Sequence, residues 1–233
     1  MSALIEAENL TRVLPAIVPV TLVRDVSLSI GEREFVAITG PSGSGKSSLL
    51  YLLGLLDRPT SGTLRIAGRD TGPLDDDALA QLRLGSLGFV FQFHFLLPEF
   101  SVLKNVELPM RKAGRLSAAK MRERAAGLLE DLGLAGHLDK MPDQLSGGQR
   151  QRVAVARALA NDPHVVLADE PTGSLDSKSS EQVFAILQDL VNKRGKTVVA
   201  VTHDMEIAAR ADRRVHLVDG RVVSDERVAR AAI

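Results

Sequence analysis

The feature that most constrains this chain is the eight-residue segment GPSGSGKS at positions 40–47. It fits the pattern G-x-x-x-x-G-K-[ST] and follows a short apolar run at residues 35–39, which is typical of a buried strand. Its three glycines let the backbone wrap closely around an anion and turn its N–H groups inward. The helix that begins at Lys46 adds a positive partial charge at its N-terminus. A glycine-rich turn that binds nothing is the plain alternative, but the strand–turn–helix context favours a cradle for phosphate groups.

Composition narrows the class of protein. The chain has 233 residues, of which 45% are apolar, and this length suits one globular domain over residues 1–233. Lys plus Arg and Asp plus Glu both number 29, so we expect no general affinity for nucleic acid. There are no cysteines, which excludes disulfides and thiolate chemistry. We also expect no signal peptide and no membrane-spanning segment.

The pattern of the chain predicts strands alternating with helices. Such alternation implies a mostly parallel central sheet that is covered on both faces. The N-terminal part reads as a separate β region, and a helix-rich stretch at residues 89–144 interrupts the alternation, so we expect an inserted α-helical subdomain at about residues 89–160. The expected strands lie at residues 4–10, 26–30, 35–39, 63–66, 164–168 and 197–202, with a hairpin around Asp219 and Gly220. The expected helices lie at residues 46–54, 117–132, 147–160 and 177–194.

The cradle carries its own chemistry. Lys46 is long enough to reach the β- and γ-phosphates of a nucleoside triphosphate, and the Ser47 hydroxyl is suited to Mg²⁺. The expected nucleotide contacts in this segment are Gly40, Pro41, Ser42, Gly43, Ser44, Gly45, Lys46, Ser47 and Ser48.

Two carboxylates follow the apolar run at residues 164–168. Ligands of open α/β sheets bind at the carboxyl ends of the strands, so Asp169 and Glu170 are predicted to face the cradle. We expect Asp169 to hold Mg²⁺ and Glu170 to orient or deprotonate an attacking water. A solvated acidic turn before Pro171 is the alternative reading.

The segment LSGGQ at residues 145–149 has two readings. Ser146 and Gln149 form a capping box at a helix start, which explains both residues. It does not explain two consecutive glycines, which cost helix stability. We expect Gly147 and Gly148 to allow an anionic group to approach the backbone.

With the RQR that follows, this segment resembles the signature motif of ABC-type ATPases. The resemblance extends from about residue 4 to residue 223, with the motifs of the family in the same order. It implies the P-loop NTPase fold of these proteins, with ATP and Mg²⁺ as cofactors. Gln92 matches the Q-loop position and joins Ser47 and Asp169 as a metal ligand, and His203 matches the switch histidine at the γ-phosphate. Asp176 matches the D-loop, although it is also a plain N-cap for the helix at residues 177–194.

The resemblance further implies a head-to-tail homodimer. Each ATP would lie between the cradle of one copy and Ser146, Gly147, Gly148 and Gln149 of the other, so neither copy has a complete site. The expected catalytic residues are Lys46, Glu170 and His203. The family usually stacks an aromatic side chain on adenine near the position of Leu14, but residues 13–23 contain no aromatic residue. We therefore expect aliphatic contact with the base and weak selectivity for ATP over GTP.

Five of the seven phenylalanines lie within residues 89–100. Phe89 and Phe91 suit a half-buried strand, whereas Phe93 and Phe95 are harder to bury, and clustered surface aromatics mark partner sites. In ABC transporters this region receives the membrane subunits, so residues 93–106 are the expected docking site for transmembrane permease subunits. The sequence of residues 91–100 resembles the corresponding stretch in the ATPases of lipoprotein-releasing and macrolide-exporting transporters. That group implies a peripheral protein at the cytoplasmic face of the bacterial inner membrane.

Two other functions share this type of ATPase head. A chromosome-maintenance or repair ATPase would carry long heptads or zinc motifs between cradle and signature, and neither is present. A regulatory module of a divisome-type complex would hold ATP without turnover, which the presence of Glu170 and His203 disfavours.

Overall fold

The computed structural model describes residues 3–228, which form two sheets flanked by helices. The small sheet is antiparallel, in the order β2 (Val20–Ile30), β1 (Ile5–Leu14), β4 (Ser61–Ile66) and β5 (Arg69–Asp70). The large sheet has the order β10 (Arg221–Arg227), β9 (Arg213–Val218), β3 (Phe35–Thr39), β8 (Thr197–Val201), β7 (Val165–Asp169) and β6 (Leu87–Phe91). Within it, only β10 runs antiparallel to its neighbour. The predicted α/β class, with a mostly parallel sheet and an N-terminal antiparallel region, is confirmed.

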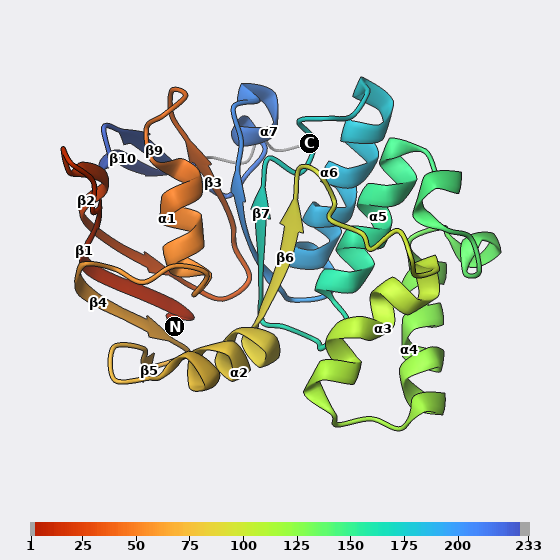
Figure 1. Cartoon of the computed structure of the whole chain (residues 1–233). Coiled ribbons are helices and arrows are strands. Elements are labelled where there is room, and N and C mark those ends of the chain that lie inside the picture. The colour runs from red at the N-terminus through yellow and green to blue at the C-terminus, as the bar shows by residue number, and fades with distance from the viewer. Residues whose placement is uncertain (1–2, 229–233) are drawn as a thin grey trace.

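Helices cover both faces of the large sheet (Figure 1). The α-helices of residues 3–228 are α1 (Lys46–Leu53), α2 (Asp76–Ser86), α3 (Val102–Ala113), α4 (Ala118–Asp131), α5 (Gly147–Ala158), α6 (Ser177–Asn192) and α7 (Met205–Ala209). Helix α1 lies between the small and large sheets, and its leucines join one apolar core there. Helices α5 and α6 lie on the opposite face, where Phe184 and Leu187 belong to a second core.

The central strands are apolar because both of their faces are covered. All five residues of β3 and of β8 are buried. The register of the parallel strands pairs Asp169 with Phe91 of β6 on one side and with Val201 of β8 on the other. The carboxyl ends of these strands therefore meet at one edge of the sheet, and the loops that follow them can share one site.

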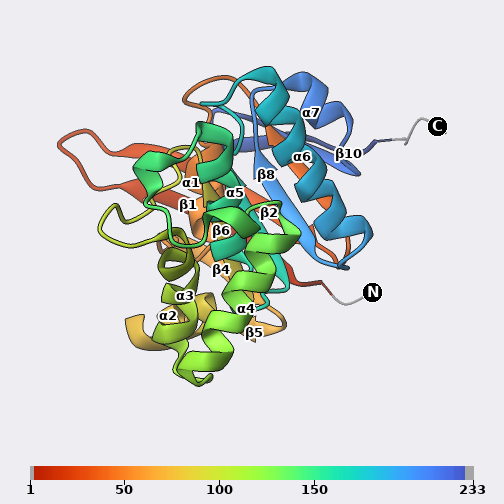
Figure 2. The same ribbon diagram turned by 90° about the vertical axis from the view of Figure 1, so that its right-hand side faces the viewer.

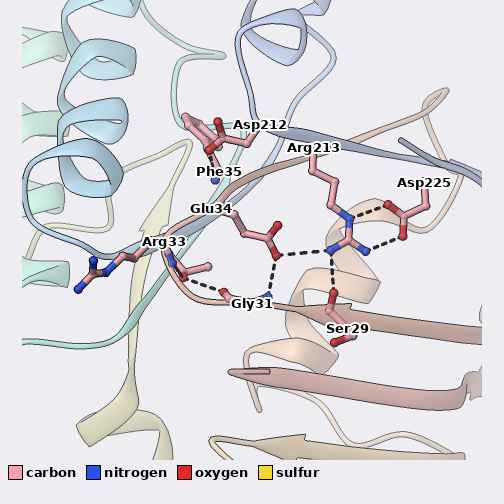
Figure 3. Close-up of polar contacts among 9 residues, drawn as sticks. Ser29, Gly31, Arg33, Glu34, Phe35, Asp212, Arg213 and Asp225 are labelled. Atoms are coloured by element: carbon pink, nitrogen blue, oxygen red, sulfur yellow. Dashed lines mark hydrogen bonds and ion pairs between the residues drawn. The ribbon is translucent and has the colours of Figure 1, made fainter. Parts of the chain in front are cut away.

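A polar network fastens the C-terminal strand pair to the core (Figure 3). The Arg213 guanidinium makes two bonds of 2.6 Å to the Asp225 carboxylate, and its remaining nitrogen donates to the Ser29 carbonyl at 2.7 Å. The same nitrogen lies 3.4 Å from Glu34, which accepts from the Gly31 N–H. Asp225, above all, raises the pKa of Arg213. At its other end this strand pair reaches the cradle, because the Gly220 N–H donates to the Ser44 carbonyl at 2.9 Å.

Most predicted elements are confirmed to within a few residues, including the strand at residues 35–39 and the helix at residues 177–194. Helices α2, α3 and α7 were not predicted individually, although α3 lies in the helix-rich stretch expected at residues 89–144. Phe89 and Phe91 lie in β6 of the large sheet, so the helices of the predicted subdomain begin only at α3. That α3 to α5 form a subdomain remains a prediction, and the ends of the predicted domain, residues 1–2 and 229–233, lie outside the described residues. Within residues 3–228 no helix is both long and apolar enough to cross a bilayer.

Candidate nucleotide site

The cradle owes its shape to glycines that no other residue can replace without displacing backbone. Gly40 has φ +146° and Gly45 has φ +95°, both in the region that favours glycine. A Cβ atom at Gly40 would lie 2.2 Å from the Leu217 carbonyl oxygen, and one at Gly45 would lie 2.2 Å from the Leu22 carbonyl oxygen. Strands β9 and β2 therefore press directly on the loop. Gly43 also has a positive φ, but a Cβ there would meet nothing within 4 Å.

Two side chains of the cradle fit a phosphate ligand. The buried Lys46 curls over its own loop, where Nζ donates to the carbonyls of Gly40 at 3.0 Å and Pro41 at 2.9 Å. The Ser44 hydroxyl is buried, and within residues 3–228 it has no hydrogen-bond partner. A phosphate oxygen is an acceptor for both groups. The residues present thus fit the nucleotide that the sequence predicts.

The metal side of the site centres on Asp169, the last residue of β7. Its Oδ1 accepts from the Ser47 hydroxyl at 2.9 Å, and its Oδ2 accepts from the Tyr51 hydroxyl at 2.8 Å. Ser47 and Tyr51 are four residues apart on α1 and so share one helix face. Oxygen donors of this kind suit Mg²⁺. Tyr51 was missed from the sequence, although its spacing from Ser47 was a usable signal.

Burial and the Asp169 carboxylate together raise the pKa of Tyr51 to about 12, and burial makes the larger contribution. The hydroxyl therefore keeps its proton at every physiological pH and acts as a donor to Asp169.

Glu170 and His203 form the second pair at this edge. Glu170 Oε2 lies 2.9 Å from His203 Nδ1, so the imidazole donates from Nδ1 to the carboxylate. Glu170 has φ +48°, an uncommon conformation for a non-glycine residue, and its N–H bonds the Val201 carbonyl. The side chain of Glu170 is largely buried and that of His203 is exposed. The predicted pair of catalytic residues is thus brought together by the ends of β7 and β8.

Gln92 directly follows β6 and lies against the loop after Glu170. The Nε2 atom of Gln92 lies 3.0 Å from the position that a Cβ of Gly173 would occupy. The backbone carbonyl of Gln92 accepts a hydrogen bond from the Ser174 hydroxyl at 3.0 Å. Gln92 is therefore held beside the strand that carries Asp169, since Phe91 and Asp169 are paired in register.

Residues 146–149 begin helix α5 as a capping box. The Gln149 N–H donates to Ser146 Oγ at 3.3 Å, and the Ser146 N–H donates to Gln149 Oε1 at 2.9 Å. A Cβ at Gly148 would lie 2.7 Å from Ser179 Oγ, so packing against α6 already requires glycine at this position. That Gly147 and Gly148 also let an anionic group approach the backbone remains a prediction, and at Gly148 this packing is a second reason for glycine.

Asp176 is the N-cap of α6, as its simpler reading predicted. Its carboxylate accepts from the Ser179 N–H at 2.9 Å and from the Ser179 hydroxyl at 2.7 Å. The bond from the Ser179 N–H is the main reason that the pKa of Asp176 is lowered. Ser179 thus bonds Asp176 and lies against Gly148, the second residue of α5.

The position expected to meet a nucleotide base is aliphatic. Leu14 is the last residue of β1, and 37% of its surface is exposed. Ile17 and Val18 are exposed in the connection between β1 and β2, and this connection projects from the body of the molecule (Figure 2).

Comparison with known proteins identifies this arrangement. Residues 23–173 match the family described as "ABC transporter". This chain belongs to the ABC transporter family. It is 54% identical over 211 residues to the lipoprotein-releasing system ATP-binding protein LolD of Anaeromyxobacter dehalogenans, covering 91% of this chain and 87% of that protein. It is 52% identical over 224 residues to the macrolide export ATP-binding/permease protein MacB of Salmonella typhi, covering 96% of this chain but 34% of that protein.

A solved structure shares the fold closely. The ATP-binding cassette MJ0796, in a dimeric post-hydrolysis state bound to ADP and Pi, superimposes with a TM-score of 0.90 at 43% identity, over 97% of this chain and 99% of that one. The chain is therefore an ABC ATPase, which binds and hydrolyses ATP as the ATPase subunit of a transporter. These relatives do not favour the regulatory or chromosome-maintenance alternatives.

Proposed function

We propose that this chain is the ATPase subunit of a transporter of the lipoprotein-release or macrolide-export type, and that it works as a homodimer beneath membrane-embedded permease subunits. The observation that carries the proposal is the convergence of Ser47, Asp169, Glu170 and His203 at one edge of the large sheet, beside a complete cradle. Similarity to LolD over most of both chains supports the transporter class. We infer an indirect attachment to the cytoplasmic face of a bacterial inner membrane.

The roles of the residues follow from their chemistry. The backbone N–H groups of residues 40–48 and the Lys46 ammonium bind the phosphates. Ser47, Asp169 and Gln92 hold Mg²⁺, which when bound neutralises charge on the phosphoryl oxygens. Glu170 accepts a proton from the attacking water, and its bond to His203 holds the carboxylate in place. His203 is exposed enough to turn toward a γ-phosphate.

The dimer supplies what one copy lacks. Ser146 starts α5 with an exposed side chain and a helix N-terminus, which is suited to a phosphate oxygen from outside the chain. Neighbouring cassette structures are described as dimeric. We infer that residues 146–149 complete the site of a second copy, placed head to tail, and that Asp176 lies near that interface.

The docking face for a permease is the surface around Phe93, Phe95 and Leu97, which are 68%, 59% and 39% exposed. Beside it lies a cavity of about 360 Å³ between α2, β6, α3 and α5, lined by Leu56, Phe89, Phe91 and Pro109 among others. This refines the expected site at residues 93–106, because Val102, Leu103 and Val106 are buried in the core and cannot touch a partner. Apolar rings beside a cavity suit an amphipathic helix of a membrane protein.

Two inactive variants test the head-to-tail site. Lys46→Ala removes the ammonium group of the cradle, and Ser146→Glu places a negative charge at the start of the segment 146–149. In a homodimer of either variant both composite sites are defective, so we expect ATP turnover to fall by about a hundredfold or more. A mixed dimer contains one composite site in which both halves are intact. Random mixing of equal amounts should therefore recover about a quarter of the wild-type phosphate release.

No recovery on mixing, with both variants folded by circular dichroism, would contradict the composite site. Full activity of Ser146→Glu alone would contradict it as well. Glu170→Gln completes the set, because it should bind ATP like the wild type while turnover falls about a hundredfold or more.

A further inference from the structure

Asp169 makes one contact that the proposed metal site does not use, the hydrogen bond from the Tyr51 hydroxyl to its Oδ2 atom. Ser47 bonds Oδ1 at 2.9 Å and Tyr51 bonds Oδ2 at 2.8 Å, so each carboxylate oxygen has its own donor. Tyr51 is the only tyrosine of the chain, and its ring packs against the core formed around α1.

The Ser47 and Tyr51 hydroxyls differ in position, and this difference gives them different roles. Ser47 is in the second position of α1, next to Lys46, and Tyr51 is one turn further along the same helix. Ser47 can exchange its bond to Oδ1 for a bond to a metal ion, since a hydroxyl oxygen has free lone pairs. Tyr51 cannot, because its ring is anchored among apolar side chains, and its hydroxyl continues to hold Oδ2.

We propose that Tyr51 is a positioning residue for the metal, which fixes the plane of the Asp169 carboxylate so that Oδ1 stays turned toward Ser47. Partners that orient a metal-binding carboxylate influence metal affinity strongly even though they never touch the ion. Without the Tyr51 hydroxyl the carboxylate is free to rotate about its last bond, and Oδ1 spends less time at the metal position. The inference rests on the proposed assignment of Ser47 and Asp169 as the metal-holding pair.

Tyr51→Phe tests this because it removes the hydroxyl and keeps the ring. The probe is Mn²⁺, which electron paramagnetic resonance detects directly, titrated into the full chain with saturating ADP. We expect the Mn²⁺ dissociation constant to rise about tenfold in Tyr51→Phe. Binding of ADP measured in EDTA should stay at the wild-type value, because the change leaves the cradle untouched.

Two further variants make every outcome informative. Thr71→Val is the matched control, since Thr71 donates a buried hydroxyl to the Leu64 carbonyl at 2.8 Å far from the cradle, and it should lose stability without changing Mn²⁺ affinity. Asp169→Asn tests the assignment beneath the proposal and should weaken Mn²⁺ by more than Tyr51→Phe does.

Unchanged Mn²⁺ affinity in Tyr51→Phe, with a clear loss in Asp169→Asn, would overturn the role of Tyr51 alone. Unchanged affinity in both variants would overturn the metal site itself. A loss of affinity in Tyr51→Phe that Thr71→Val reproduces would mean that general destabilisation, rather than orientation of Asp169, is responsible.

Discussion

The cradle at residues 40–47 and the aromatic segment at residues 92–101 both directly follow a strand of the same sheet, yet they are shaped in opposite ways. The cradle is set by its own residues, because its glycines adopt positive φ and accept the close approach of neighbouring backbone. The aromatic segment has two consecutive non-glycine residues in the left-handed region, His94 at φ +60° and Phe95 at φ +48°. Nothing in its own sequence favours that conformation.

Side chains from helices α3 and α5 hold the aromatic segment instead. Arg157 of α5 donates to the carbonyls of His94 and Phe95, both at 2.6 Å. Gln151, also of α5, donates to the Phe91 carbonyl at 3.2 Å and to the Pro171 carbonyl at 2.6 Å. Asn105 of α3 is fully buried, and it bonds the backbone of residues 97, 100 and 101.

The difference has a functional consequence. The cradle needs no side-chain support from α3 or α5, because its glycines adopt the positive φ values that the loop requires. The aromatic segment depends on α3 and α5, and α5 begins directly after Ser146. Gln151 and Arg157 therefore form a hydrogen-bonded connection between α5 and the segment that carries the exposed Phe93 and Phe95.

The largest effect should come from adding one methyl group to the cradle. In Gly45→Ala the new Cβ meets the Leu22 carbonyl oxygen at 2.2 Å and sits on a residue with φ +95°. We expect a loss of about 3–5 kcal/mol in the free energy of unfolding, together with loss of ATP binding. Urea denaturation and a fluorescent ATP analogue measure the two.

Gly43→Ala is the control for that variant. Gly43 also has a positive φ, but its Cβ would meet no atom within 4 Å, so only the backbone cost of about 1–2 kcal/mol applies. Equal losses of unfolding free energy in both variants would show that backbone strain alone requires glycine in the cradle. The close approach of the Leu22 carbonyl on β2 would then make no contribution.

What could be predicted from the sequence follows the same division. The strands before the cradle and before Glu170 could be predicted, because an apolar run and the residues that follow it are adjacent in the sequence. The support of the aromatic segment could not be found, since Gln151 and Arg157 lie about sixty residues beyond the carbonyls that they bond. Tyr51 was missed because it lies outside the phosphate-binding motif, although its spacing of four residues from Ser47 places it on the same face of α1. The packing of Gly148 could not be predicted, because Ser179 lies on another helix.

The next largest effect concerns the support of the aromatic segment. Arg157→Met keeps the aliphatic stem and removes both donors, leaving the carbonyls of His94 and Phe95 without their bonds to Arg157. We expect a loss of about 2–3 kcal/mol, with faster amide hydrogen exchange confined to residues 93–97. Arg157→Lys retains a charge but lacks the fork, and it should lie between the two. Uniform exchange over the whole of α5 instead would mean that Arg157 holds the helix rather than the loop.

A smaller effect is expected from the exposed rings. Phe95 packs edge-to-face on Phe91 with centroids 5.4 Å apart, whereas Phe93 is 68% exposed. Phe95→Ala should cost about 1 kcal/mol of stability and Phe93→Ala less than about 0.5 kcal/mol. Both should weaken copurification with the permease subunit. A Phe93→Ala variant that unfolds would place this ring in the core and contradict the docking face.

The smallest expected effect is a dependence of stability on pH that arises from His94. This imidazole is buried in the aromatic segment, and burial lowers its pKa, with Arg150 and Arg157 adding to the effect while the bond to Gln151 opposes it. The Gln151 amide donates to two carbonyls, so its oxygen faces His94 and accepts the Nδ1 proton at 2.6 Å. Protonation would add a charge that this buried site does not favour.

The folded chain therefore binds fewer protons at His94 than the unfolded chain does. Its contribution to stability is complete above the unfolded pKa of about 6.5 and is lost as the pH falls through the lowered folded pKa. Urea denaturation of the wild type and of His94→Gln across this range should show a steeper loss toward acid in the wild type. Parallel curves for the two proteins would mean that His94 does not titrate with folding. Residues 40–47 contain no histidine, so this dependence on pH is expected from the aromatic segment and not from the cradle.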